Sequence, residues 1–223
     1  MAKSDFCVIG LGRFGMQVAK SLAANDYNVI LIDNDEEKVK LASKEFEYVF
    51  QTDATDLNSL IELNISDINT VIVSISNIEE SIMICANLKE LKIKNIVARA
   101  KNSIHKRVLS TIGVRETVIP EEIVGENIAI KVIHNMTADI FPLGKAISMV
   151  RTNVSNPDLY NKRLVDLSLR EYGGANIISI QRQDKLIFPI TAETVLLQAD
   201  VVSAVCNSDS IDAFLKYISP RKN

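Results

Sequence analysis

The chain has 223 residues, and its 25 basic and 28 acidic residues give a net charge of −3. This acidic balance argues against a nucleic-acid-binding protein, because such proteins usually present a basic face. Hydrophobic residues make up 47% of the chain, which suffices for a packed core, and the length suits one large domain or a medium domain with a small one.

Local patterns disfavour several other classes of protein. No apolar run approaches the roughly 18 residues that a membrane-spanning helix needs. The apolar run near the N-terminus is short and interrupted by glycines, unlike a signal peptide, so we expect a cytoplasmic protein. The three cysteines fall in expected core elements and indicate buried, reduced thiols. The two histidines, His105 and His134, lie far from any metal-ligand spacing and are expected on helix surfaces.

Residues 6–15 contain the strongest local signal in the chain. The run 6–9 is apolar and partly β-branched, as expected of a strand covered on both faces. Gly10, Gly12 and Gly15 follow at GxGxxG spacing, which permits a tight turn, close approach of a phosphate and close packing of a helix on the strand. Arg13 lies within this loop, where its planar guanidinium suits a terminal phosphate; the alternative is a solvated arginine at a helix start.

A second apolar strand over residues 28–32 ends at Asp33, 18 positions after Gly15. In dinucleotide-binding folds an acid about 20 residues beyond the glycines accepts hydrogen bonds from ribose hydroxyls. The glycine loop and this acid together predict a nucleotide-binding βαβ unit.

Strands and helices continue to alternate up to residue 120. Further strands are expected at 48–51, 70–75, 95–99 and 116–119, with helices after the acidic turn 34–37 and at 57–63, 79–92 and 103–112. This alternation predicts an α/β fold, a Rossmann-type doubly wound parallel sheet.

Polar residues follow two of these strands at the edge where ligands of such sheets bind. Asp53 and Thr55 either form a wall against an adenine base or serve as helix caps alone. Arg99 either faces a phosphate or base, or forms a salt bridge at the rim.

A helix is expected from Pro120 to about residue 135, since proline and two acids form a favourable helix start. Its apolar residues fall around the whole circumference at ~100° per residue, so it needs cover on all sides. A second copy of the chain is the simplest cover, and the C-terminal lobe of the same chain is the alternative.

Residues 137–144 are interpreted as a linker because they contain Pro142 and Gly144. From residue 145 onward the pattern predicts a small α+β lobe without a glycine-rich phosphate loop. Its strands are expected at 146–150, 176–180 and 200–205, with a hairpin partner at 186–189 and helices at 164–169 and 210–217.

The order of these parts resembles the RCK (KTN) family, the cytosolic regulators of potassium channels and transporters. The residues that carry the resemblance in the first half are Val8–Gly15, Asp33, Asp53-Ala54-Thr55, Arg99 and Pro120-Glu121. Those in the second half are Arg170–Gly173, Ile177–Ile180, Pro189 and Asp200. The match covers essentially the whole chain, and a single copy at this length is similar to the regulatory subunit of Ktr-type potassium uptake systems.

The resemblance implies three parts: a Rossmann nucleotide-binding domain at 1–120, a crossover and dimerisation helix with its linker at 121–144, and a ligand-binding lobe at 145–223. The first part would bind ATP or ADP, or alternatively NAD(H), with Arg13 on the terminal phosphate and Asp33 on the ribose. The nucleotide-binding residues implied are Gly10, Gly12, Arg13, Phe14, Gly15, Asp33, Asn34, Asp53, Ala54, Thr55, Ser74, Ile75 and Arg99.

The resemblance also implies further ligands and partners. Glu121 would help to hold a divalent cation, Mg²⁺ or Ca²⁺, near the phosphates at a dimer interface. The second lobe would bind cyclic di-AMP through Arg170, Asn176, Ile177, Ile178 and Pro189. Homodimers would assemble into an octameric ring on the cytosolic face of a membrane-embedded potassium-translocating subunit, and nucleotide exchange would gate the potassium flux.

Two departures from the family pattern concern the adenine turn and the last strand. Thr52 stands where the family usually has a glycine, which bears on how closely the turn approaches adenine. The glycine usual after the last strand is absent, and residues 206–208 are Cys-Asn-Ser.

An NAD(P)-dependent oxidoreductase and a redox-sensing transcriptional repressor are the alternatives to a regulatory subunit. An enzyme needs a positioned acid or base, but the chain has no Tyr-x-x-x-Lys pair and neither histidine follows a strand. A repressor needs a DNA-binding module, and no basic recognition segment is present. We therefore expect a binding protein without catalytic activity.

Overall fold

The computed structural model describes residues 6–134, 138–172 and 174–220. The chain forms two compact units, Met1–Pro120 and Glu121–Asn223, called here the first and the second unit. No helix of the described residues is both long and apolar enough to cross a membrane.

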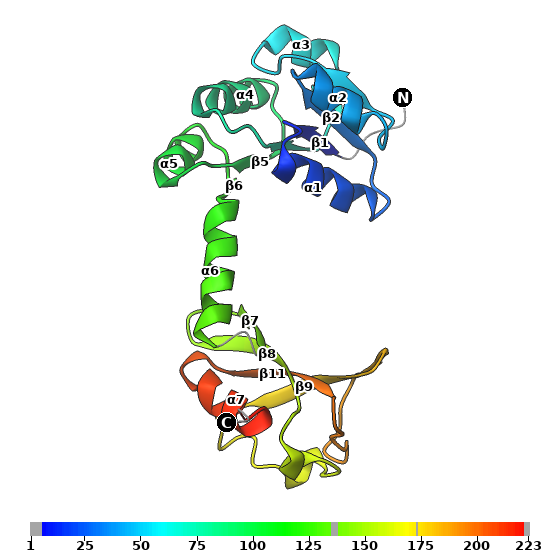
Figure 1. The fold of residues 1–223 in the computed structure, drawn as a ribbon. Coiled ribbons are helices and arrows are strands. Elements are labelled where there is room, and N and C mark those ends of the chain that lie inside the picture. Colours follow the sequence, from blue (N-terminus) through cyan, green and yellow to red (C-terminus); the bar gives the residue numbers. More distant parts are fainter. Residues whose placement is uncertain (1–5, 135–137, 173, 221–223) are drawn as a thin grey trace. The chain divides into compact units, whose positions relative to one another are not determined.

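The first unit contains a six-stranded sheet with the order β3-β2-β1-β4-β5-β6, in which every neighbouring pair is parallel (Figure 1). This order and direction confirm the Rossmann-type fold. The strands are β1 (Phe6–Ile9), β2 (Val29–Asp33), β3 (Val49–Gln51), β4 (Thr70–Val73), β5 (Asn95–Arg99) and β6 (Glu116–Val118). The helices are α1 (Arg13–Ala23), α2 (Glu36–Ala42), α3 (Leu57–Glu62), α4 (Ile78–Glu90) and α5 (Ser103–Thr111), with a 3₁₀ turn at Ile65–Asp67.

Side chains of the central strand alternate between two apolar clusters, one on each face of the sheet. Cys7 and Ile9 belong to the larger cluster, together with buried residues of α3, α4 and α5, whereas Val8 packs with Ala19 of α1 and Ala42 of α2. A strand covered on both faces reads as a continuous apolar run, which is why β1 is recognisable in the sequence. All three cysteines are buried free thiols, as expected.

The second unit has a five-stranded antiparallel sheet with the order β10-β9-β11-β8-β7. Its strands are β7 (Ala138–Pro142), β8 (Ile147–Asn153), β9 (Asn176–Arg182), β10 (Lys185–Ile187) and β11 (Val201–Asn207). The helices are α6 (Pro120–Ile133) and α7 (Ile211–Ile218), with 3₁₀ turns at Pro157–Leu159, Leu164–Asp166 and Ser208–Ser210.

The interpretation of residues 137–144 as a linker was wrong. Within this range, residues 138–142 form β7, an edge strand that pairs with β8, while residue 137 lies outside the described residues. Ala138 and Ile140 are buried and alternate with more exposed side chains. This alternation was not recognised in the sequence, because Pro142 at the end of an edge strand resembles a turn signal. The helix expected over 164–169 is also shorter, a single 3₁₀ turn at Leu164–Asp166.

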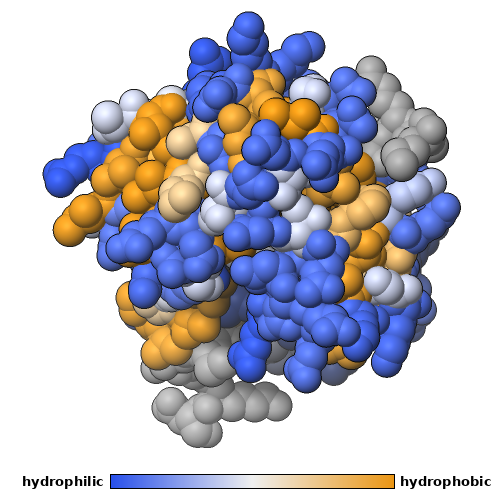
Figure 2. Space-filling view, turned by 90° about the horizontal axis from the view of Figure 1, so that it is seen from above, coloured by the Kyte–Doolittle hydropathy of each residue, from blue (hydrophilic) through white to orange (hydrophobic). Residues whose placement is uncertain are grey.

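Helix α6 has no buried residue within the described chain. Ile123, Val124, Ile128, Val132 and Ile133 are each more than half exposed, and only Ile130 packs against the core of the second unit. The C-terminal lobe, the alternative of the two expected covers, therefore does not enclose this helix. Elsewhere the surface mixes polar and apolar residues, as the face drawn in Figure 2 shows, where hydrophilic side chains predominate around separate hydrophobic areas.

Candidate functional site

The glycine loop joins β1 to α1 at the carboxyl edge of the parallel sheet. Gly10 has φ +95°, and a Cβ atom there would lie 2.8 Å from the carbonyl oxygen of Ser74. A Cβ atom on Gly15 would collide with the carbonyl oxygen of Gly10. Both positions therefore require glycine for the fold itself.

Gly12 differs, because a Cβ atom at this position would meet nothing within 4 Å. Gly12 is the N-cap residue of α1, and no side chain of the described residues caps this helix or places an acid in its first turn. The N-termini of α2, α3, α4 and α5 are instead capped by Asp35, Asp56, Asn77 and Asn102. The first N–H groups of α1 are thus left for an external anion beside an open glycine.

Asp33 is only 5% exposed and holds the loop in place. Its Oδ2 accepts a hydrogen bond from the backbone N–H of Leu11 at 2.6 Å, and its Oδ1 accepts one from the N–H of Asp35 at 2.9 Å. Lys38 donates to Oδ1 over 3.3 Å. The sequence predicted a ribose contact for this carboxylate, and its bracing of the glycine loop is an additional role that spacing alone does not reveal.

The turn after β3 is built by its own side chains. Asp53 Oδ1 accepts hydrogen bonds from the N–H and the hydroxyl of Thr55, at 2.9 and 2.7 Å, and these bonds lower the pKa of Asp53. Asn87 of α4 donates from Nδ2 to the carbonyl oxygen of Thr55 at 2.8 Å. The sequence alone did not indicate this role of Asn87, because Asn87 lies 32 residues after Thr55 and inside a helix.

A small cavity of about 20 Å³ brings most of the predicted adenosine-side residues together. Asp33, Asn34, Asp53, Ala54, Thr55 and Ile75 line it, joined by Ile9, Thr52, Glu80 and Ile84. A neighbouring cavity of about 60 Å³ is lined by Ile75, Ser76, Arg99 and Lys101. Arg99 donates to Ser76 Oγ at 3.1 Å. The sequence analysis did not predict Lys101, although it lies two residues beyond the end of β5.

The remaining predicted residues of the first unit differ in exposure. Arg13 is exposed at the first position of α1, and Phe14 beside it is half-buried. Ser74 is buried under the loop, and its N–H donates to the carbonyl oxygen of Ile9 at 2.7 Å. The Ser74 hydroxyl has no hydrogen-bond partner among the described residues.

The expectation that both histidines lie on helix surfaces was wrong for His105, which is 1% exposed. Its Nδ1 accepts a hydrogen bond from the N–H of Lys101 at 3.2 Å, and burial lowers its pKa. The polar residues around His105 in the sequence had suggested an exposed position. His134 lies just beyond α6, with Nδ1 2.7 Å from Asp212 Oδ1.

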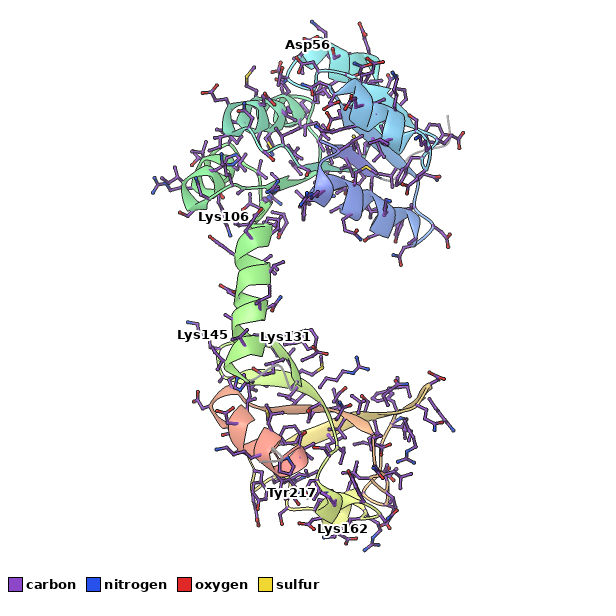
Figure 3. All side chains as sticks on the ribbon, viewed as in Figure 1. Asp56, Lys106, Lys131, Lys145, Lys162 and Tyr217 are labelled. Atoms are coloured by element: carbon purple, nitrogen blue, oxygen red, sulfur yellow. The ribbon has the colours of Figure 1, made fainter. Side chains whose placement is uncertain are left out.

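The second unit contains a cavity of about 590 Å³ between the segments 164–171, 175–177 and 190–192. Arg170, Asn176 and Ile177 line it, whereas Ile178 and Pro189 do not. Ile177 is buried and Ile178 is 38% exposed, at a point where the register between β9 and β11 shifts. Nearby, Tyr172 stacks on Tyr217, labelled in Figure 3, with ring centroids 4.0 Å apart.

Glu121 lies in the first turn of α6 beside Glu122. Among the described residues, no three His, Cys, Asp or Glu side chains gather into a group that holds a metal ion.

Comparisons with known proteins give matches along most of the chain. The TrkA-N domain model matches residues 6–120 and the TrkA-C domain model matches residues 149–219. The chain is 50% identical to "Uncharacterized protein MG323" of Mycoplasma genitalium, over 99% of this chain and 98% of that protein. It is 35% identical to "Ktr system potassium uptake protein C" of Bacillus subtilis, over 97% of this chain and 98% of that protein.

Solved structures share the fold at low sequence identity. "GsuK channel bound to NAD" has a TM-score of 0.65 at 15% identity and covers all of this chain and 40% of that one. "Crystal structure of the GsuK bound to ADP" has a TM-score of 0.53 at 18% identity and covers 58% of this chain and 35% of that one. On its two matched domains and its nearly full-length relatives, the chain belongs to the RCK family of TrkA-N and TrkA-C proteins.

Proposed function

We propose that this chain is a nucleotide-binding regulatory subunit that controls potassium uptake through a separate membrane-embedded subunit. The observation that supports nucleotide binding is the N-terminus of α1: no side chain of the described residues caps it, and the space beside Gly12 is open. The link to potassium uptake is supported by the relatives named as Ktr system proteins. As such a subunit it would work at the cytosolic face of the membrane, held there by its partner.

ATP and ADP are the proposed ligands of residues 1–120. The exposed Arg13 beside the loop provides a cation for a terminal phosphate, while the small cavity next to Asp53 and Thr55 marks the adenosine side. NAD(H) is the second candidate, since one solved structure of this fold is named as NAD-bound. An oxidoreductase would use the same crevice, but His105 is buried and therefore poorly placed to exchange a proton with a substrate there.

Residues 121–144 are proposed to join two copies of the chain, because the apolar side chains of α6 are exposed in the single chain. Dimers of this kind would build the octameric ring, with Glu121 sharing a divalent cation with the nucleotide phosphates. Residues 145–223 are proposed to bind cyclic di-AMP at the cavity lined by Arg170, Asn176 and Ile177. The remaining two residues of the proposed set, Ile178 and Pro189, would contact the ligand only from outside this cavity.

Calorimetric titration of the nucleotide-free protein with ATP, ADP, NADH and cyclic di-AMP tests this function. ATP and ADP are expected to bind at one site per chain. Gly12→Ala is the informative variant, because its methyl group enters open space in the protein but stands where a phosphate would approach. We expect a loss of affinity of about tenfold or more, with a melting temperature lowered by only a few degrees because alanine is a poorer N-cap residue than glycine. Binding of NADH alone would instead support an oxidoreductase.

A further inference from the structure

A large cavity of the first unit lies at the amino edge of the sheet, opposite the edge that carries the glycine loop. Its volume is about 500 Å³, within the ~300–1,000 Å³ range of small-molecule sites. It is formed by the end of α4, the first residues of β5 and the connection between α5 and β6. Its lining residues are Lys89, Ile93, Lys94, Asn95, Ile96, Val97, Gly113, Arg115 and Glu116.

Three exposed cations line this amino-edge cavity, against the single acid Glu116. Within the described part of the chain, the side chains of Lys89, Lys94 and Arg115 form no hydrogen bond or ion pair. The chain as a whole is acidic, with a net charge of −3, so the concentration of positive charge here is local.

Only one of these cations is explained by a favourable interaction with a helix dipole. Lys89 lies in the last turn of α4, where a positive charge complements the helix dipole. Lys94 and Arg115 lie in the connections that enter β5 and β6, outside any helix. Their like charges repel each other across the cavity, and an anion placed between them would remove that repulsion.

The backbone shapes the cavity around these side chains. Gly113 has φ +92°, and a Cβ atom there would lie 3.3 Å from Cε of Lys89, so the glycine makes room for the lysine stem. Ile93 and Ile96, each at most 6% exposed, are buried apolar residues of the lining. Charges beside a low-dielectric wall attract an anion more strongly than charges on a flat polar surface do.

We propose that the amino-edge cavity binds a small anion that carries two or more phosphate groups, at a site separate from the glycine loop. Arg115 would hold one phosphate with two parallel hydrogen bonds, and Lys94 and Lys89 would act as point charges on the others. The limited volume favours such a ligand over an extended polyanion.

Calorimetric titration with inorganic tripolyphosphate tests the proposal on the full chain. We expect binding that weakens with salt and falls at least about tenfold in the double variant Lys94→Gln/Arg115→Gln. Arg115→Lys keeps the positive charge but loses the planar guanidinium, so we expect an affinity between those of the wild type and the double variant. Lys106→Gln, on α5 and outside the lining (Figure 3), is the matched control and should bind as the wild type does.

The variant Gly12→Ala separates this cavity from the glycine loop. Tripolyphosphate binding that survives in the double variant but is lost in Gly12→Ala would overturn the proposal, as would absence of binding to the wild type. Sedimentation with phosphatidylglycerol vesicles distinguishes a lipid headgroup as the source of phosphate. Vesicle binding that depends on Lys94 and Arg115, without tripolyphosphate binding, would also overturn the proposal.

Discussion

Arg13 occupies the first position of α1 with an exposed side chain, whereas the backbone around it is fixed by Gly10, Gly15 and Asp33. The side chain can therefore change without disturbing the loop. This separation makes Arg13 the residue at which discrimination between nucleotides is most easily tested.

We expect Arg13→Ala to narrow the difference between the affinities for ATP and ADP, because only ATP has a third phosphate for the guanidinium. A loss of about 1.5–3 kcal/mol for ATP is typical of a hydrogen bond to a charged group. The measurement is calorimetric titration with both nucleotides. Arg107→Ala, an exposed arginine on α5, is the control, and an unchanged ATP-to-ADP ratio in Arg13→Ala would show that Arg13 does not contact the terminal phosphate.

His105 gives the first unit a pH-dependent stability. Burial lowers its folded-state pKa below the usual 6.5, so the unfolded chain binds the proton more readily. The free energy of unfolding should therefore fall as the pH drops through 6.5, by up to about 1.4 kcal/mol per pH unit, until the folded state is protonated as well.

Urea unfolding between pH 5 and pH 8 checks this expectation against His105→Gln, which lacks the titrating group. Plotted against pH, the free energy of unfolding of the wild type should approach that of the variant at the acidic end. Parallel plots would show that His105 does not cause the pH dependence. Asp53 titrates outside this window, because its pKa is lowered from 3.8 and its contribution disappears only at more acidic pH.

Elements differed in how well the sequence predicted them, for a physical reason. Strands β1, β2 and β4 are buried on both faces, so uninterrupted apolar runs reveal them. β7 is an edge strand with only two buried residues. Its alternation of apolar and polar residues was too short to predict a strand in spite of the turn signal from Pro142. The adenosine-side turn was visible as Asp53 and Thr55, but its tie to Asn87 depends on tertiary packing across 32 residues.

Helix α6 is an element whose apolar pattern is plain in the sequence and whose apolar side chains are exposed in the single chain. If a second copy covers it, Ile128→Glu should shift the protein to a smaller species in analytical ultracentrifugation, because a charge would enter an apolar interface. Ile128 is 56% exposed in the single chain, so the fold itself should tolerate the change. Leu41→Glu, at a residue 61% exposed on α2, is the control, and unchanged assembly of the Ile128 variant would exclude α6 as the interface.

At the scale of the whole molecule, each unit has its own core. The proposed function assigns the small adenosine-side cavity of the first unit and the large cavity of the second unit to two different ligands. Regulation requires that a ligand bind two conformations with different affinities, since equal binding shifts nothing. Any effect of a nucleotide on the affinity for cyclic di-AMP must be matched by an equal reciprocal effect.

We therefore expect ADP and cyclic di-AMP to bind simultaneously, with additive stoichiometry and equal fold-changes in each other's dissociation constants. Titration of each ligand into protein saturated with the other measures both quantities. Arg170→Ala should weaken cyclic di-AMP alone, because Arg170 lines the second-unit cavity and belongs to the other unit from the glycine loop. Displacement of one ligand by the other would place both in a single site, and it would remove the basis for a regulator that integrates two signals.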